Sequence, residues 1–260
     1  MQKPRLSVVV LTKNAQGCIG ACLESVKWGD EIIIIDGFST DGTAEICRKY
    51  GARVIQSEFN GFALERNKGV ENSTGDWILQ LDADEVVTPG LADALRNAMA
   101  ASSGAPSDAV GYKFRRKNYF LGRPMRYGGW YHYSAHFFKK GCGRYEGLIH
   151  ERLKLNGPQG TIEAEIEHRP FSSMEQFMDR QNRYTGYEAR DILNEKGVLP
   201  EKEILYNLKV KPLKLFWKMY IKKQGFREGR IGLIFSIMFS YVHFMKWAKY
   251  WELTYGKNAA

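Results

Sequence analysis

Cysteine is scarce in this chain of 260 residues, which contains four cysteines and no Cys-x-x-Cys pair. The cysteines and histidines also lack the spacing of a structural metal centre. Cys18 and Cys22 lie four residues apart on a predicted helix, where we expect buried free thiols. A reducing cytoplasm fits this usage best.

Long apolar segments are also missing. The N-terminal stretch MQKPRLSVVVLTKN has a short apolar run and no cleavage site behind it, so it predicts a first strand rather than a signal peptide. The uncharged run at 231–242 has twelve residues, fewer than the roughly 20 that span a bilayer. We therefore expect a core or interfacial helix there.

Two common nucleotide-binding motifs are absent. No G-x-x-x-x-G-K-[ST] occurs, and the stretch closest to a dinucleotide fingerprint, GCGRYEG at 141–147, has the wrong spacing. The sequence therefore does not support a P-loop kinase or a nicotinamide enzyme.

Negative charge is scarce at the C-terminal end. Residues 196–260 contain 13 lysines and arginines against 4 acids, whereas residues 1–195 contain 25 of each sign. This excess predicts an anionic partner for the tail, and its interleaved aromatic residues favour a membrane surface. A nucleic-acid-binding protein is the alternative from another class, but the sequence has no recognised nucleic-acid module.

The first hundred residues show a regular alternation of strand and helix patterns. Buried, β-branched runs alternate with amphipathic stretches that begin at cap-type residues. The predicted strands are 6–12, 31–36, 52–57 and 76–82, and the predicted helices are 19–26, 39–51, 62–73 and 89–100. This order predicts an α/β fold with a Rossmann-like, doubly wound, mostly parallel sheet, whose ligands bind at the carboxyl ends of the strands.

The rest of the chain has a different character. Residues 109–170 are rich in aromatic and basic residues and contain strand-like pieces, and 173–195 has a helical pattern. Beyond Pro200 the chain is helical, basic and aromatic to its end, so we expect a helical, basic C-terminal appendage.

Polar residues follow three of the predicted strands: Thr12-Lys13-Asn14, Asp36 and Asp82-Ala83-Asp84. In an extended segment, residues two apart point the same way, so Asp82 and Asp84 are expected to share a ligand. Carboxylates suit Mg²⁺ or Mn²⁺, with water and diphosphate as the other ligands. The alternative is a solvated acidic turn that caps the next helix. Placement after a buried strand favours the metal–diphosphate site.

Four ordered stretches carry a resemblance to a known family: VVVLTKN, IIIIDGFSTDGTAE, ALERNKGVENSTGDWILQLDADE and GRYEGLIHERL. They resemble family 2 inverting glycosyltransferases of the GT-A fold, over roughly the first 155 residues. The stretch KPLKLFWKMYIKKQGFREGRIGL further resembles lipopolysaccharide-core β-1,4-glucosyltransferases, which add glucose to the inner-core heptose. One departure from the family is Phe38, where a small residue is common.

The resemblance implies roles for the residues at the strand ends. Asp36 would bind the base or ribose of a nucleoside-diphosphate sugar, in a pocket lined by Thr12 and Asn14. Asp84 would bind the metal, which neutralises the charge on the leaving diphosphate. The remaining nucleotide contacts would be Arg66, Asp82 and Ala83. A solvated helix arginine is an equal alternative for Arg66.

Inversion of the sugar requires a base on the acceptor side. The family places its His-Glu pair at the active site, so Glu151 is expected to be the base, and His150 a third metal ligand or a diphosphate contact. No role is expected for His132, His136 or His168. Trp130 and Tyr131 suit sugar stacking and core packing equally.

Together these observations predict residues 1–195 as a GT-A catalytic domain, with a nucleotide-sugar half (1–105) and an acceptor half (106–195). Residues 196–260 are predicted to associate with an anionic membrane. The resemblance implies transfer of glucose from UDP-glucose to an inner-core heptose or a similar lipid-linked saccharide, on the cytoplasmic face of the bacterial inner membrane. No nucleic acid is expected as a partner. The closest alternative is a sugar nucleotidyltransferase, although TKNAQGCIG is not its usual Gly-rich basic loop.

Overall fold

The computed structural model describes residues 3–101, 109–147 and 151–256. The chain packs as two compact units. Unit 1 comprises residues 1–116 and 132–168, and unit 2 comprises residues 117–131 and 169–260. The functional boundary expected between residues 195 and 196 is drawn from the charge distribution, and it does not coincide with the boundaries of these packed units. It stays a prediction.

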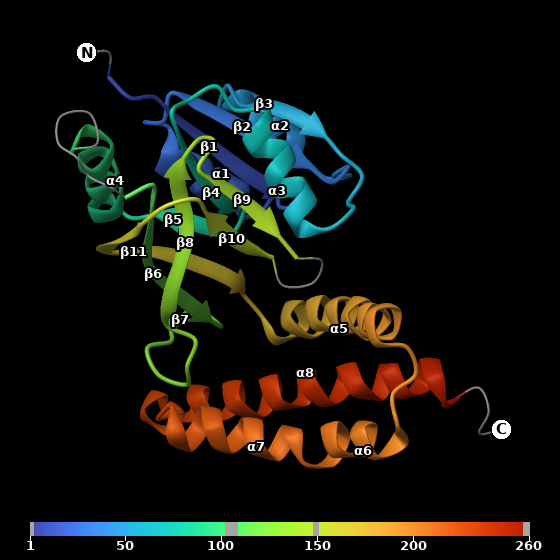
Figure 1. The fold of residues 1–260 in the computed structure, drawn as a ribbon. Coiled ribbons are helices and arrows are strands. Elements are labelled where there is room, and N and C mark those ends of the chain that lie inside the picture. The colour runs from blue at the N-terminus through green and yellow to red at the C-terminus, as the bar shows by residue number, and fades with distance from the viewer. Residues whose placement is uncertain (1–2, 102–108, 148–150, 257–260) are drawn as a thin grey trace. The chain divides into compact units, whose positions relative to one another are not determined.

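A parallel four-stranded sheet forms the N-terminal half of unit 1 (Figure 1). Its strand order is β3-β2-β1-β4, and helices connect the strands as the alternating pattern predicts. The elements are β1 (Leu6–Thr12), α1 (Ile19–Val26), β2 (Glu31–Asp36), α2 (Thr43–Lys49), β3 (Arg53–Gln56), α3 (Phe62–Glu71), β4 (Trp77–Asp82), β5 (Glu85–Val87) and α4 (Pro89–Ala101).

The sheet continues beyond β4 with antiparallel pairs, in the order β8-β6-β11-β5. The strands that follow α4 are β6 (Gly111–Phe120), β7 (Arg123–Pro124), β8 (His132–Lys139), β9 (Gly143–Glu146), β10 (Arg152–Leu155) and β11 (Gln159–Phe171). Strands β9 and β10 form a separate antiparallel pair. The predicted α/β fold class with a Rossmann-like parallel half is confirmed.

Both faces of the parallel strands are covered, as their continuous apolar runs require. Alternate residues of β1 point to opposite faces: Val8 and Val10 pack with α1, α2 and α4, and Val9 packs with α3 and β9. Helix α1 buries its four predicted positions, including Cys22. Cys18 is only half-buried, contrary to expectation, because it precedes the first turn of α1.

Helix α2 begins later than its cap-type residues predict. The sequence places its start near Ser39, whereas the helix begins at Thr43. Ser39 instead donates its hydroxyl to Asp36, and the backbone N–H of Thr40 donates to Asn14 at 2.8 Å. Polar residues that could cap a helix therefore hold the turn after β2 in place.

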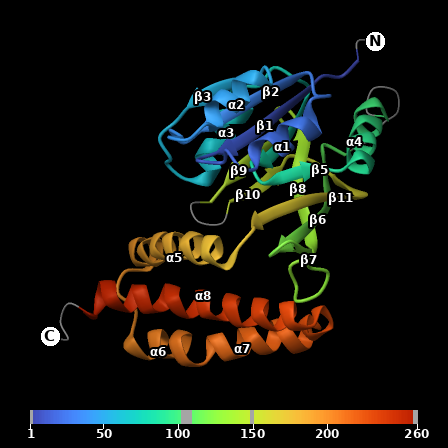
Figure 2. The same cartoon turned by 180° about the vertical axis from the view of Figure 1, so that it is seen from behind.

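Unit 2 is mainly helical. Its helices are α5 (Met174–Lys196), α6 (Glu201–Lys209), α7 (Lys211–Trp217) and α8 (Arg230–Thr254), with a π-helical turn (Lys218–Lys222) and a 3₁₀ turn (Gly225–Glu228) between α7 and α8. In both views α8 lies between α5 and the α6–α7 pair (Figures 1 and 2). Its inner face contributes Phe235, Trp247 and Tyr250 to two apolar clusters.

Within the described residues, α8 is the one helix long and apolar enough to cross a membrane when judged by length and composition alone. Core helices of soluble proteins pass the same test. The helix extends well beyond the uncharged run at 231–242 on its C-terminal side, through Lys246 and Lys249.

Candidate active site

Three of the predicted site residues meet at one edge of the parallel sheet. Thr12 ends β1 and lies opposite Asp36, which ends β2. On the other side of β1, Leu11 lies opposite Asp82, which ends β4. The carboxyl ends of β2, β1 and β4 therefore place Asp36, Thr12 and Asp82 side by side, where ligands bind in such sheets.

The turn after β2 is held by the side chain of Asp36, which is fully buried. Its carboxylate accepts hydrogen bonds from the backbone N–H (3.0 Å) and the hydroxyl (2.5 Å) of Ser39. Asn14 adopts a left-handed conformation (φ 49°), and its N–H donates to the Ser39 hydroxyl at 2.8 Å. Phe38 is also left-handed (φ 57°) and its side chain is exposed. This exposed aromatic ring therefore stands beside a rigid polar turn.

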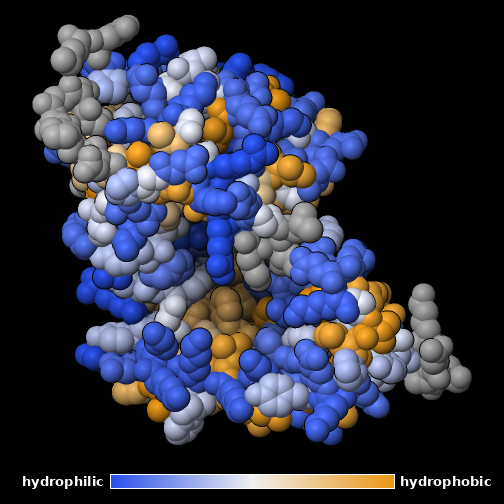
Figure 3. All heavy atoms as spheres, viewed as in Figure 1, coloured by the Kyte–Doolittle hydropathy of each residue, from blue (hydrophilic) through white to orange (hydrophobic). Residues whose placement is uncertain are grey.

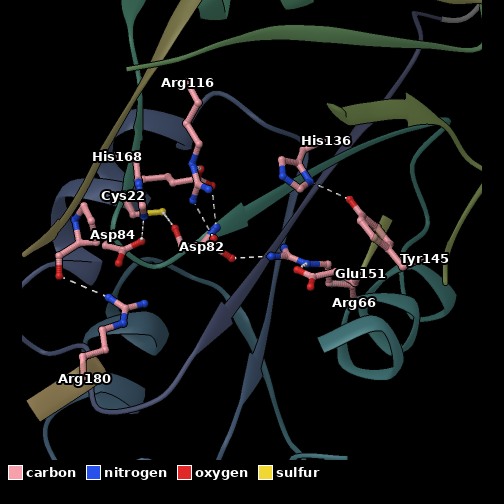
Figure 4. A network of polar contacts seen from close by, with 12 residues as sticks. Cys22, Arg66, Asp82, Asp84, Arg116, His136, Tyr145, Glu151, His168 and Arg180 are labelled. Atoms are coloured by element: carbon pink, nitrogen blue, oxygen red, sulfur yellow. Dashed lines mark hydrogen bonds and ion pairs between the residues drawn. The ribbon is translucent and has the colours of Figure 1, made fainter. Parts of the chain in front are cut away.

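The Asp82-Ala83-Asp84 segment is not extended. Asp82 is the last residue of β4, the chain turns at Ala83 and Asp84, and β5 begins at Glu85. The expectation that Asp82 and Asp84 share a face of one extended segment is wrong for this reason. Asp82 and Asp84 have different partners, which are Arg66 and Arg116 for Asp82 and His168 for Asp84 (Figure 4).

Arginine side chains balance two of the three acids. Arg66 on α3 donates to Asp82 Oδ1 at 2.8 Å, and Arg116 on β6 pairs with Asp82 Oδ2 at 3.0 Å. The Nε of Arg116 also pairs with Glu85 Oε1 at 2.7 Å. Mutual repulsion within the acidic cluster is thus relieved by two protein cations.

Burial and these ion pairs shift the pKa values in opposite directions. Burial alone would raise the pKa of Asp82, but the charges of Arg66 and Arg116 outweigh it and hold this pKa well below its usual range. Burial raises the pKa of Glu85, and the attraction of Arg116 offsets only part of that rise. Burial, followed by the charge of Arg66, lowers the pKa of His136 to about 3. Asp82 is therefore ionised and His136 neutral at physiological pH.

Asp84 lies against a histidine that no local sequence pattern singles out. The Nε2 atom of His168, near the end of β11, is 3.4 Å from Asp84 Oδ1, and both side chains are about 90% buried. A carboxylate oxygen and an imidazole nitrogen at this distance suit a shared divalent cation. In residues 3–101, 109–147 and 151–256, no group of three or more His, Cys, Asp and Glu side chains is placed to hold a metal ion. His150, the predicted third ligand, lies outside the described residues.

Glu151, the predicted base, contacts the same arginine as Asp82. The Nε of Arg66 donates to Glu151 Oε1 at 3.2 Å, and the Glu151 side chain keeps 19% of its surface exposed. The Arg66 guanidinium also lies 5.5 Å from the centre of the Tyr145 ring. Figure 4 shows Arg66 between Asp82 and Glu151, in contact with both carboxylates. The side chain of Arg66 is buried, so the alternative of a solvated helix arginine is wrong.

A pair of hydrogen bonds fixes β9 against α3. Asn67 Nδ2 donates to the carbonyl of Tyr145 at 2.8 Å, and the Tyr145 N–H donates to Asn67 Oδ1 at 2.9 Å. The Tyr145 hydroxyl is 3.0 Å from Nδ1 of His136. The segment that leads towards Glu151 is therefore attached to the helix that carries Arg66.

Sequence reasoning did not identify Arg116, His136 or His168 as parts of this site. Arg116 lies in a basic stretch of a predicted strand, and His168 ends the pattern TIEAEIEH. Nothing local distinguishes either residue from its neighbours. Only the pairing of β6 with β8 and of β11 with β5 brings them to the acidic turn.

Comparison with known sequences gives one family and several relatives. Residues 7–150 match the sequence model of the family described as Glycosyl transferase family 2. The chain is 27% identical to the lipopolysaccharide core biosynthesis glycosyltransferase LpsC of Rhizobium meliloti, over 95% of this chain and 92% of the relative. It is 25% identical to an uncharacterized glycosyltransferase of Rickettsia bellii, over 98% of this chain and 89% of the relative.

Comparison with solved structures gives more distant similarities. TarS of S. aureus, in complex with UDP-GlcNAc, is 15% identical and has a TM-score of 0.49, over 98% of this chain and 92% of that one. Glucosyl-3-phosphoglycerate synthase of Mycobacterium tuberculosis, solved with Mn²⁺ and UDP, is 20% identical and has a TM-score of 0.38, over 44% of each chain.

The family match covers the parallel sheet, the acidic turn and the strands that supply Arg116 and His136. It extends over more than half of the chain and confirms the resemblance that the four ordered stretches predict. The chain belongs to glycosyl transferase family 2.

Proposed function

We propose that this glycosyltransferase is metal-dependent and inverting, and that it transfers glucose from UDP-glucose to an inner-core heptose of lipopolysaccharide or a similar lipid-linked saccharide. The observation that carries the proposal is the adjacency of Asp36, Thr12 and Asp82 at one sheet edge in a family 2 chain. The similarity to LpsC over nearly the whole chain supports the acceptor class. Family membership favours sugar transfer over the alternative nucleotidyl transfer.

The donor would lie along this edge. Asp36 fixes the Asn14 and Ser39 turn, which would lie against the base and ribose, and the exposed ring of Phe38 offers a surface for stacking. Arg66 and Arg116 supply positive charge next to Asp82, where a diphosphate would bring negative charge. Asp82 orients both guanidinium groups in advance, which lowers the cost of ordering them around the donor.

Asp84 and His168 would hold the divalent cation. Their donor atoms, a carboxylate oxygen and an imidazole nitrogen, fit Mn²⁺, and with additional water ligands they also fit Mg²⁺. When bound, the ion would neutralise the charge that develops on the leaving diphosphate. His168 replaces His150 in this proposal as the ligand for which the described structure offers support.

Glu151 would take the proton of the acceptor hydroxyl. Arg66 holds one of its oxygens at 3.2 Å, so the carboxylate has a fixed position while its second oxygen stays outside this ion pair. A base fixed beside the donor site favours attack from the side opposite the leaving group, which gives inversion.

We further propose that unit 2 holds the enzyme on the cytoplasmic face of the inner membrane. One face of α8 packs within unit 2, while its other face exposes large apolar side chains: Leu233, Ile234, Ile237, Tyr241 and Phe244, each 39–48% accessible. Hydrophobic side chains reach the surface over the C-terminal helices, between hydrophilic ones (Figure 3). Because its inner face is occupied, α8 suits a position in the plane of the bilayer surface rather than across it.

Transfer of labelled glucose from UDP-glucose to purified truncated lipopolysaccharide that ends at the inner-core heptose would test the reaction. The proposal predicts labelled product in the presence of Mn²⁺ or Mg²⁺ and a β-linkage by nuclear magnetic resonance. A product with an α-linkage would contradict inversion. Labelling only with another nucleotide sugar would contradict the glucose assignment.

A further inference from the structure

Unit 2 contains a pocket of about 240 Å³ that the sugar-transfer chemistry does not use. Its apolar part is formed by Trp130, Met219, Phe235 and Phe239. The Trp130 ring lies 5.0 Å from the Phe235 ring and 5.4 Å from the Phe239 ring, centre to centre. Such an aromatic surface suits an aliphatic chain or another apolar group.

Two lysines lie at the same pocket because the helix between them is a π-helical turn. The N–H of Lys223 donates to the carbonyl of Lys218 at 2.8 Å, an i to i+5 hydrogen bond. In a regular α-helix, side chains five residues apart point in clearly different directions, whereas this wider turn lets Lys218 and Lys223 line one cavity. The unusual turn therefore concentrates positive charge at an apolar pocket.

The opposite wall is a glycine loop whose position is fixed. Gly128 and Gly129 have left-handed backbones (φ 80° and 86°), and a Cβ on Gly128 would come within 3.3 Å of the Phe235 ring. The Gly128 N–H donates to the carbonyl of Lys223 at 2.8 Å. Glu228 accepts from the backbone N–H groups of Arg126 and Tyr127, at 2.7 Å each. The pocket is thus formed before any ligand arrives.

The charge around this pocket has one sign. Glu228 is the single acid in the sequence between residues 204 and 251, and it is engaged with the loop. Among the described residues, none of those that line the pocket is acidic. We propose that this pocket binds an amphipathic phosphate, with the phosphate at Lys218 and Lys223 and an aliphatic tail against Trp130 and Phe239. This goes beyond sugar transfer and needs no bound donor.

Calorimetric titration of the full chain with decyl phosphate, below its micelle concentration, would test the site. We expect one molecule to bind, and inorganic phosphate or uncharged decyl maltoside to bind at least about tenfold more weakly, because each keeps one half of the interaction. If inorganic phosphate binds as tightly as decyl phosphate, the site takes free phosphate and the proposal is wrong. Equal binding of decyl maltoside would exclude the lysine contacts.

Two double variants with the same net charge separate the pocket from general electrostatic attraction. Lys218→Gln/Lys223→Gln should weaken decyl phosphate binding by about tenfold or more. Lys214→Gln/Lys222→Gln removes two exposed lysines of the same segment that do not line the pocket, and it should bind as the unmodified protein does. An equal loss in both variants would overturn the proposal. Because no sugar donor is present, this result and that of the transfer assay are independent.

Discussion

Replacing Arg66 with methionine should destabilise unit 1 strongly, because it removes a buried cation shared by two carboxylates. The Arg66 side chain is 4% exposed and contacts Asp82 at 2.8 Å and Glu151 at 3.2 Å. Removing one member of a buried ion pair typically costs about 3–5 kcal/mol. In the variant, Asp82 is still paired with Arg116. The Asp82 side chain is also 30% exposed and the Glu151 side chain 19% exposed, so water can partly solvate both carboxylates. We therefore expect a loss of about 2–3 kcal/mol at pH 7.

The loss should depend on pH in a defined direction. In the unmodified protein the folded-state pKa of Asp82 lies well below its usual value, chiefly because the arginine charges outweigh burial. Such a group adds stability above the unfolded-state pKa of about 3.9, and this stability is lost as the pH falls towards the folded-state value. Without Arg66 the depression is smaller. Both proteins share the unfolded-state pKa of Asp82, so the difference in stability between them should narrow only as the pH falls below the folded-state pKa of Asp82 in the variant.

Hydrogen exchange of the α3 and β4 amides, at pH 7 and after equilibration in acid, measures the stability of this part of unit 1. A local measurement is needed because two compact units can unfold separately. Arg96→Met is the matched control, since Arg96 pairs with Asp93 at 2.9 Å in an exposed position. It should change stability by no more than about 1 kcal/mol. An Arg66→Met loss no larger than that of this control, or a loss that grows as the pH is lowered, would contradict the proposed role of the Arg66–Asp82 pair.

Three further changes address the proposed base, the partly buried His136 and the exposed apolar face of α8. Glu151→Gln should lower turnover by about 10²–10⁴-fold in single-turnover assays and leave the donor Kd almost unchanged; full activity would place the base elsewhere. Because burial holds the pKa of His136 at about 3 in the folded protein, stability should fall as the pH drops from 6.5 towards 3. In urea unfolding measured over a series of pH values, His136→Gln should make the free energy of unfolding depend less on pH in this range. An unchanged pH dependence would contradict the lowered pKa of His136. Ile237→Gln/Phe244→Gln should reduce co-sedimentation with anionic vesicles, whereas Leu205→Gln, an exposed position on α6, should not; equal effects would exclude the α8 face.

Local signals in the sequence were sufficient for the parallel half of the fold. β-Branched runs such as EIIIID and spaced apolar residues such as those of α1 determine element type through neighbours in the chain. Competition for the same polar atoms explains the one clear boundary error. Ser39 looks like a helix cap in isolation, but it binds Asp36, and α2 starts four residues later.

The partners of the acidic turn could not be predicted in the same way. The cluster of Asp82, Asp84 and Glu85 calls for a counter-ion, and sequence reasoning supplied a metal ion because the acids are close in the chain. In the structure, Arg116 and His168 reach these acids from positions over 30 and 80 residues away. These contacts arise from the pairing of strands that are distant in the chain, and no local sequence pattern specifies which strands pair.

Titration of UDP-glucose into the protein by calorimetry, with Mn²⁺ and then with a chelator, tests whether the donor site depends on a metal ion. We expect binding that requires Mn²⁺ and is lost or strongly weakened in Asp84→Asn and His168→Ala. Glu24→Gln, an exposed acid on α1, should bind as the unmodified protein does. Equal affinity with Mn²⁺ and with the chelator in all of these proteins would contradict a metal-dependent donor site at the end of β4.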